Sequence, residues 1–215
     1  VDYHDVNYLD GNTVYMANDG GVYVSYNNGA AWDNLSNGLA IAQMYGFGQS
    51  STNPNLLVQG WQDNGTNRYN GFSWAEIMGA DGMLCFIDRT NDQNIWASSQ
   101  NGGLARSTNG GGFFTNAVGN INETGGWVTP WSQDPVAANT IYAGFVNMWR
   151  STNGGISWTK ISTFSNTQNI NTFAVSPANN QIIWATKATG LYMTSNGGTT
   201  WTTITNVPSG TITGI

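Results

Sequence analysis

The chain has 215 residues, of which only 8% are charged, and it contains 28 glycines and 10 tryptophans. This composition is typical of β-rich, turn-rich proteins and argues against an α-helical fold. A formal net charge of −6 disfavours nucleic acid and anionic membranes as partners, and no run of about 18 apolar residues predicts insertion into a membrane.

A turn motif recurs along the chain. It reads "SYNNGAAW" at 25–32, a decayed "NRYNGFSW" at 67–74, "STNGGGFF" at 107–114, "STNGGISW" at 151–158 and "TSNGGTTW" at 194–201. The closing aromatic residues are 42, 40, 44 and 43 residues apart. Spacing this even predicts a repeat protein whose unit is about 43 residues long.

Each unit divides into four short apolar segments, and four strands are the number in one blade of a β-propeller. In the fourth unit the predicted strands are 128–134, 140–145, 147–151 and 156–161. We therefore predict an all-β fold, a β-propeller of four-stranded blades with about five blades in this chain, as part of a larger propeller. The predicted blades span approximately 1–35, 43–77, 82–117, 127–161 and 171–204, and 211–215 is expected to begin a further strand.

The turn motif has a structural explanation in every position. The Asn153 side chain can cap its own turn, and Gly155 can take the positive φ of a tight hairpin. The Trp158 ring can fill the gap between neighbouring blades. The residues given this structural role are Ser25, Asn27, Gly29, Trp32, Gly71, Trp74, Ser107, Asn109, Gly111, Phe114, Ser151, Asn153, Gly155, Trp158, Thr194, Asn196, Gly198 and Trp201.

These motifs resemble the BNR or Asp-box repeat, S-x-D-x-G-x-x-W, of sialidases, sortilin-type (VPS10) propellers and xyloglucanase-like family 74 glycoside hydrolases. Asn replaces the family's Asp in four boxes, and in the second box Asn67 and Tyr69 stand where Ser and Asp would. The phrases "VDYHDVNYL", "NDGGVYVSYNNGAAW", "QDNGT" and "GADGMLCFID" resemble secreted bacterial sortilin-like or glycoside-hydrolase-like propellers. The resemblance implies a longer protein, with its ligand site on the face away from the boxes.

Several polar and aromatic residues are expected on that opposite face. They belong to the turns between second and third strands or to the connections between blades, where Glu123 also lies. The predicted ligand-binding residues are Asp19, Trp61, Asp63, Asn64, Asp81, Gln100, Asn101 and Trp127. Carboxylates and amides can bond a sugar or a protein, and an indole can stack on a sugar ring.

The carboxylates of this face allow three interpretations. Asp-Gly and Asn-Gly are tight-turn sequences whose side chains cap backbone N–H groups, which gives a purely structural role. A second role is ligand binding. The third is glycoside hydrolysis, which needs two flanking carboxylates; Asp19, Asp63 and Asp81 are the catalytic candidates.

Sialidase activity is not expected, because it needs three clustered arginines. Arg106 and Arg150 lie beside box serines on the wrong face, Arg68 flanks the decayed box, and Arg89 lies in a turn between first and second strands.

No metal site is predicted. His4 is the one histidine and lies between Asp2 and Asp5, an arrangement that favours a paired structural imidazole over a metal ligand. Calcium bound by Asp and backbone oxygens stays open as a cofactor, although no 12-residue calcium loop is present. Cys85 is the one cysteine and is expected to be a small buried hydrophobic residue.

The leading interpretation is a non-catalytic interaction or carbohydrate-binding scaffold in a secreted or cell-surface bacterial protein. Its expected partners are a polysaccharide or another surface protein, together with the remaining blades of the same longer chain. One alternative is a family 74-like glycoside hydrolase acting on polysaccharide. The other is an architectural repeat of a surface filament or adhesin.

Overall fold

The computed structural model describes residues 2–39, 42–207 and 210–215. It contains five four-stranded antiparallel sheets in which the strands follow chain order from one edge to the other. This confirms the predicted all-β fold built of propeller blades. Within the described residues, no helix is long and apolar enough to cross a membrane.

The first two sheets contain β1 (Tyr3–Tyr8), β2 (Val14–Asn18), β3 (Gly21–Ser25) and β4 (Asp33–Asn34), then β5 (Met44–Gln49), β6 (Leu57–Trp61), β7 (Gly65–Tyr69) and β8 (Trp74–Met78). The third contains β9 (Cys85–Ile87), β10 (Ile95–Ser99), β11 (Gly103–Ser107) and β12 (Thr115–Asn116), with the short helix η1 (Gln100–Gly102) after β10. The last two contain β13 (Trp131–Gln133), β14 (Ile141–Gly144), β15 (Met148–Ser151) and β16 (Thr159–Lys160), then β17 (Ile170–Val175), β18 (Ile183–Lys187), β19 (Gly190–Thr194) and β20 (Thr202–Ile204).

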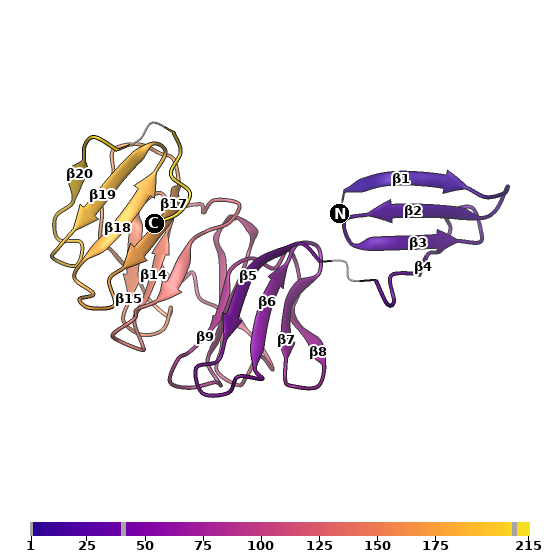
Figure 1. Cartoon of the computed structure of the whole chain (residues 1–215), viewed down its shortest axis with the longest axis horizontal. Coiled ribbons are helices and arrows are strands. Elements are labelled where there is room, and N and C mark those ends of the chain that lie inside the picture. Colours follow the sequence, from indigo (N-terminus) through magenta and orange to yellow (C-terminus); the bar gives the residue numbers. More distant parts are fainter. Residues whose placement is uncertain (1, 40–41, 208–209) are drawn as a thin grey trace.

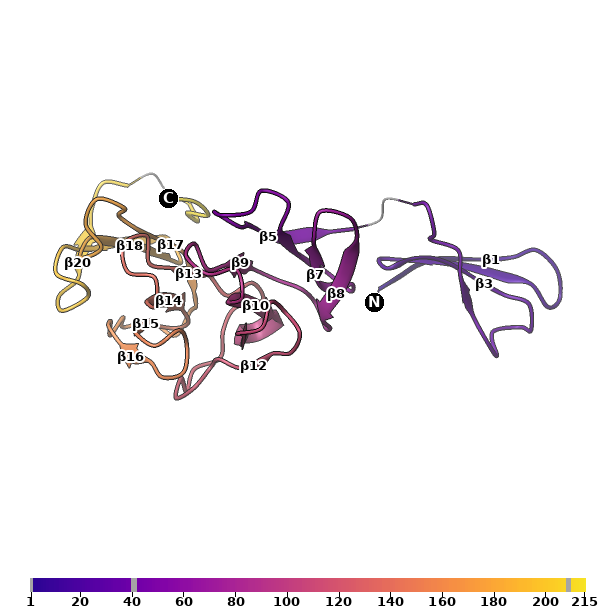
Figure 2. The same cartoon turned by 90° about the horizontal axis from the view of Figure 1, so that it is seen from below.

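The second to fifth sheets succeed one another in chain order, and the first sheet lies to one side of them (Figures 1 and 2). Every residue of β1 is exposed, including Tyr3, Val6 and Tyr8. By contrast, β10 and β14 are almost wholly buried. The hydrophobic core therefore lies between the later sheets, with Trp96, Ile141 and Phe145 among its most buried members.

Strands are shorter than predicted toward the outer edge. Within the predicted segment 156–161, only the two residues of β16 form a strand. The residues before them belong to the hairpin, where Ser157 N donates to Asn153 Oδ1 instead of to a neighbouring strand. Predicted strand 128–134, at the opposite edge of the same sheet, is also shorter and contains only β13. Residues 211–215 have no strand conformation; the Ile212 carbonyl accepts hydrogen bonds from the side chains of Asn171 and Thr186.

The four hairpins at 25–32, 107–114, 151–158 and 194–201, here called box hairpins, share one hydrogen-bond pattern. In the third of them, Ser151 Oγ accepts from Gly155 N at 2.8 Å, and Asn153 Oδ1 accepts from Ser157 N at 3.0 Å. Gly155 has φ 95°. The expected Asn cap and positive-φ glycine are present, and the serine hydroxyl supplies a second cap that the sequence reasoning omitted.

The second box is a shortened hairpin. The strand register pairs Leu57 with Tyr69, as it pairs Ile95 with Ser107, so Tyr69 and not Asn67 occupies the serine position. From there the closing aromatic residue comes two residues early, at Trp74. Asn70 Oδ1 caps this shorter turn by accepting from Phe72 N and Ser73 N.

The closing aromatic rings fill the gap between sheets only in the later repeats. Trp158 is 5% exposed, and its Nε1 donates to Ala117 O of the preceding sheet at 2.8 Å. Trp201 makes the same bond to Ile161 O. Trp32 and Trp74 are 38% and 41% exposed, so the space-filling role expected of them is wrong. A buried indole needs a neighbouring sheet against it, and these two lack one on that side.

The main chains of the second and third sheets come into close contact at glycine residues. A Cβ atom at Gly60 would lie 1.9 Å from Met83 O, and one at Gly82 would lie 2.1 Å from Gly65 O. Only glycine allows main chains this close. Cys85 lies at the same junction, where burial raises the pKa of its thiol to about 12, which confirms a buried hydrophobic role.

Candidate ligand-binding face

The turns between second and third strands and the connections between sheets lie together, as predicted. Gly82 N, just before the third sheet, donates to Trp61 O at the end of β6. Ile170 N, at the start of β17, donates to Phe145 O just after β14. We call this side of the molecule the loop face. Main-chain hydrogen bonds hold its loops together, so the backbone that carries its side chains has a fixed position.

Asp63 and Asp81 are neighbours on the loop face. Asp63 has φ 60° in the turn between β6 and β7, and its N–H donates to Asp81 Oδ1 at 2.9 Å. Asn64 N donates to Trp61 O in the same turn. The turn interpretation therefore holds for one oxygen of Asp81, which caps a backbone N–H group of the neighbouring loop.

Trp127 is connected to these two loops by hydrogen bonds through Tyr45. Its indole is 46% exposed, and Nε1 donates to the Tyr45 hydroxyl at 3.4 Å, across 82 residues of sequence. The Tyr45 hydroxyl donates to Gln62 Oε1 at 3.0 Å, and Gln62 directly precedes Asp63. The structure thus adds Tyr45 and Gln62 to the predicted residues. The sequence analysis considers only the loops, so it misses Tyr45 within β5. Gln62 lies in the β6–β7 turn, of which only Asp63 and Asn64 are predicted to bind.

Trp61 and the Gln100–Asn101 pair are engaged mainly in structure. Trp61 packs against Trp74 with ring centroids 5.5 Å apart, and its Nε1 donates to Gln59 Oε1. Asn101 has φ 59°, and its backbone exchanges bonds with Trp127 O and Gly125 N. Gln100 Oε1 is buried without a hydrogen-bond partner among the described residues.

Asp19 belongs to a different pair. Its carboxylate accepts a hydrogen bond from His4 Nε2 across β1 and the β2–β3 turn. The hydrogen bond raises the pKa of His4 and lowers that of Asp19, with their mutual attraction acting in the same direction. No hydrogen bond found among the described residues joins this pair to Asp81. In the parts of the chain that the structure describes, no group of three potential metal ligands occurs.

Glu123 is also committed to the fold. Its carboxylate accepts from Asn147 N at 2.8 Å, Asn147 Nδ2 at 2.8 Å and Trp149 Nε1 at 3.0 Å. Burial acts to raise its pKa, but the bonds from Asn147 and Trp149 outweigh burial and leave the pKa below its usual value. Glu123 therefore fastens the connection between the third and fourth sheets.

The arginines also have structural roles. Arg106 Nη1 donates to Asn153 O and Arg150 Nη1 donates to Gly197 O, each at 3.4 Å. Arg68 Nη1 donates to Gly110 O. Each bond joins one sheet to the hairpin of the next, so these arginines are spread along the molecule instead of clustering around one carboxylate.

The loop face therefore offers a half-exposed indole, a phenol, amides and the carboxylates of two neighbouring loops. Such groups can stack on a sugar ring and bond its hydroxyls.

No known protein-family profile matches the sequence, and no curated protein sequence is detectably similar to it. Solved structures do share its fold. An ancestral family 74 glycoside hydrolase matches with a TM-score of 0.67 at 23% identity, over 97% of this chain and 32% of that one. The family 74 xyloglucanase from Xanthomonas campestris matches with a TM-score of 0.62 at 14% identity, over 92% and 37%.

The extracellular domain of a proposed one-component system protein from B. thetaiotaomicron also matches, with a TM-score of 0.61 at 15% identity, over 98% and 29%. The chain spans about a third of the length of these proteins. These likenesses show that the chain has the fold of part of a larger propeller. They fix no activity.

Proposed function

We propose that this chain is part of an extracellular propeller that binds a polysaccharide through its loop face. The observation that carries the proposal is the half-exposed Trp127 indole, held by Tyr45 next to Gln62 and the Asp63–Asp81 pair. An indole fixed at one edge leaves a ring face for stacking, and the neighbouring amide and carboxylates can accept bonds from sugar hydroxyls.

The charge of the chain supports a neutral ligand. Its twelve acidic residues outnumber its six basic ones, so a phosphate-rich partner would be repelled. The arginines Arg68, Arg106 and Arg150 are bonded to hairpin carbonyls. Secretion or cell-surface display, and assembly with further blades of the same protein, belong to the same proposal.

A glycan array followed by titration of the best glycan tests the proposal. Trp127→Ala should weaken binding by about fivefold or more, because a stacked aromatic ring contributes on the order of 1 kcal/mol. Phe113→Ala is the matched control, since Phe113 is a 59% exposed aromatic residue of a box hairpin. Equal affinity of the Trp127 variant and the control would remove the loop face as the binding site. Binding of a protein but of no glycan would point to the adhesin role.

Glycoside hydrolysis is the second candidate, because Asp63 and Asp81 lie on neighbouring loops of this face, joined by the bond from Asp63 N to Asp81 Oδ1. Hydrolysis needs one carboxyl group to protonate the leaving group and a second to act as base or nucleophile. Release of reducing ends from xyloglucan by the wild type, abolished in both Asp63→Asn and Asp81→Asn, would establish it. Glycan binding without any release of reducing ends would leave the binding proposal standing and exclude xyloglucan hydrolysis.

A further inference from the structure

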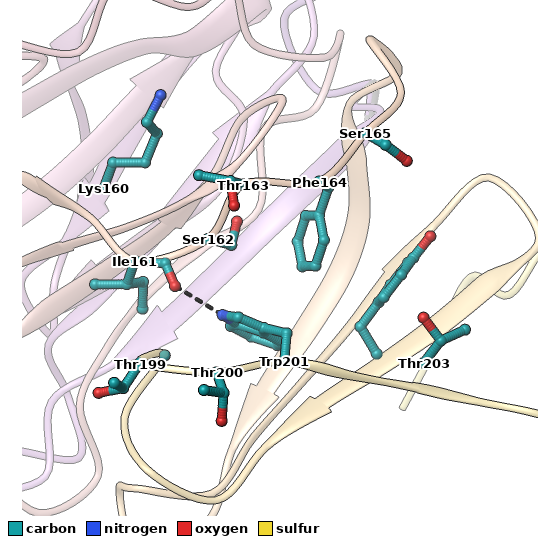
Figure 3. Close-up of a pocket in the computed structure, with 12 residues that line it drawn as sticks. Lys160, Ile161, Ser162, Thr163, Phe164, Ser165, Thr199, Thr200, Trp201 and Thr203 are labelled. Atoms are coloured by element: carbon teal, nitrogen blue, oxygen red, sulfur yellow. Dashed lines mark hydrogen bonds between the residues drawn. The ribbon is translucent and has the colours of Figure 1, made fainter.

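A groove opens between the fourth and fifth sheets, and none of its lining residues belongs to the Trp127 site. It has a volume of about 600 Å³ and lies between the box hairpin of the fifth sheet and the segment that follows β16. Figure 3 shows Phe164 and Trp201 next to each other among the residues that line it. Ligand pockets in proteins commonly have volumes of roughly 300–1,000 Å³, so the groove is large enough for a small ligand.

The equivalent junction between the third and fourth sheets is closed. There the Asn120 side chain accepts from Trp158 N at 2.8 Å and donates to Trp158 O at 3.0 Å. Trp158 is 5% exposed as a result. The two junctions have the same register, because Trp158 Nε1 bonds Ala117 O and Trp201 Nε1 bonds Ile161 O. Counting onward, Gly119 corresponds to Thr163 and Asn120 to Phe164.

These two replacements explain why the groove is open. A Cβ atom at Gly119 would lie 2.8 Å from Ile156 O and 3.1 Å from Trp158 Cδ1, so a residue with a side chain cannot follow the closed path. Thr163 has such a side chain. Phe164 cannot form the two bonds that Asn120 makes; its ring packs instead on Tyr192 and Trp201, with centroids 4.5 Å and 5.3 Å away.

The lining combines aromatic rings with hydroxyl groups. Half of the twelve lining residues are serine or threonine, and Lys160 is the one charged residue among them. Thr163, Ser165 and Thr203 are exposed, and no hydrogen bond of their hydroxyl groups is found within the described part of the chain. A wall of rings beside unused hydroxyls suits a sugar, whose ring faces are apolar and whose edges are polar.

From this geometry we infer that the groove between the fourth and fifth sheets is a second binding site, which takes a pyranose residue of an oligosaccharide. The Tyr192 and Trp201 rings, which pack on Phe164, provide the stacking surface, and the threonine and serine hydroxyls bond the edge of the sugar. The groove shares no residue with the Trp127 site, so it goes beyond the function proposed above.

Titration calorimetry with two defined probes tests the inference: cellohexaose, which is neutral, and a hexamer of galacturonic acid, which would engage Lys160. The wild type should bind at least one of them. Thr163→Gly combined with Phe164→Asn installs the pair that closes the neighbouring junction and should abolish this binding. Trp127→Ala should leave it unchanged, which separates the groove from the Trp127 site.

A second variant guards against misfolding of the double variant. Thr163→Trp adds a bulky ring from an exposed position and should obstruct the groove while the circular dichroism spectrum stays that of the wild type. A weakening of about fivefold or more in this variant supports the inference. Wild-type affinity in both groove variants, or no binding of either hexamer by the wild type, would overturn it. Binding lost only in Trp127→Ala would likewise assign the sugar to the loop face alone.

Discussion

Arg150 of β15 donates a hydrogen bond from Nη1 to Gly197 O, inside the hairpin of the next sheet, at 3.4 Å. Arg106 bonds Asn153 O in the same way one repeat earlier, and Arg68 bonds Gly110 O one repeat before that. In each repeat the arginine directly precedes the first position of the hairpin. The corresponding residue of the first sheet is Val24, which cannot donate such a bond, and that sheet lies to one side of the others (Figure 1).

Replacing Arg150 by alanine should therefore destabilise the contact between the fourth and fifth sheets. A hydrogen bond from a charged donor contributes about 1–3 kcal/mol, and the partly buried position places the expected loss at about 1–2 kcal/mol of unfolding free energy. Urea denaturation measures it. Arg89→Ala is the control, because no hydrogen bond of the Arg89 side chain is found in the described residues. An equal loss in both variants would show that the bond to Gly197 has no special role.

Asn153→Asp should be tolerated, whereas Asn153→Ala should not. Asn153 Oδ1 accepts bonds from Ser151 Oγ and Ser157 N, and a carboxylate oxygen can do the same. The aspartate loses only the Nδ2 bond to Ser157 Oγ. We expect unfolding free energy within about 0.5 kcal/mol of wild type for aspartate and a loss of about 1 kcal/mol for alanine. Thermal unfolding of the two variants in parallel decides it; an aspartate variant as unstable as alanine would contradict the prediction.

Glu123 should make stability depend on pH in the acid range. Its folded pKa is below the usual value of 4.5, because the bonds from Asn147 and Trp149 outweigh burial. As the pH falls, Glu123 of the unfolded chain therefore takes up a proton before Glu123 of the folded chain. Its contribution to the free energy of unfolding is complete above about pH 4.5 and is lost as the pH falls through the folded pKa. Glu123→Gln should flatten the fall in melting temperature below that pH. Glu76→Gln is the control at an exposed position, and it should leave the dependence of the melting temperature on pH unchanged.

His4 should titrate above its ordinary pKa of 6.5, because the Asp19 carboxylate bonds and attracts the protonated ring. An NMR titration of the imidazole protons measures this directly. Asp19→Asn should move the pKa back toward 6.5. Asp5→Asn is the control, since the Asp5 carboxylate accepts a bond from Val6 N instead. A His4 pKa that responds equally to both changes would contradict the specific pairing.

The repeat predicted the fold because a period of about 43 residues leaves room for four strands and little else. The same pattern could not predict that Trp32 and Trp74 are exposed, since their burial depends on a neighbouring sheet and not on their own motif. Nor could it pair Trp127 with Tyr45, which lies 82 residues away in the sequence. The groove beside Trp201 depends on Thr163 and Phe164, whose effect is visible only when two junctions are compared in space.

The glycine contact between the second and third sheets has a consequence for how such proteins diversify. At Gly60 and Gly82 the main chains themselves set the spacing, so a side chain at either position would force the two sheets apart. At the later junctions the packing also depends on two residues of the connection: Gly119 and Asn120 close one junction, whereas Thr163 and Phe164 stand at the equivalent positions beside the groove of the next. New binding sites can therefore arise at one end of the molecule while the other end preserves its geometry.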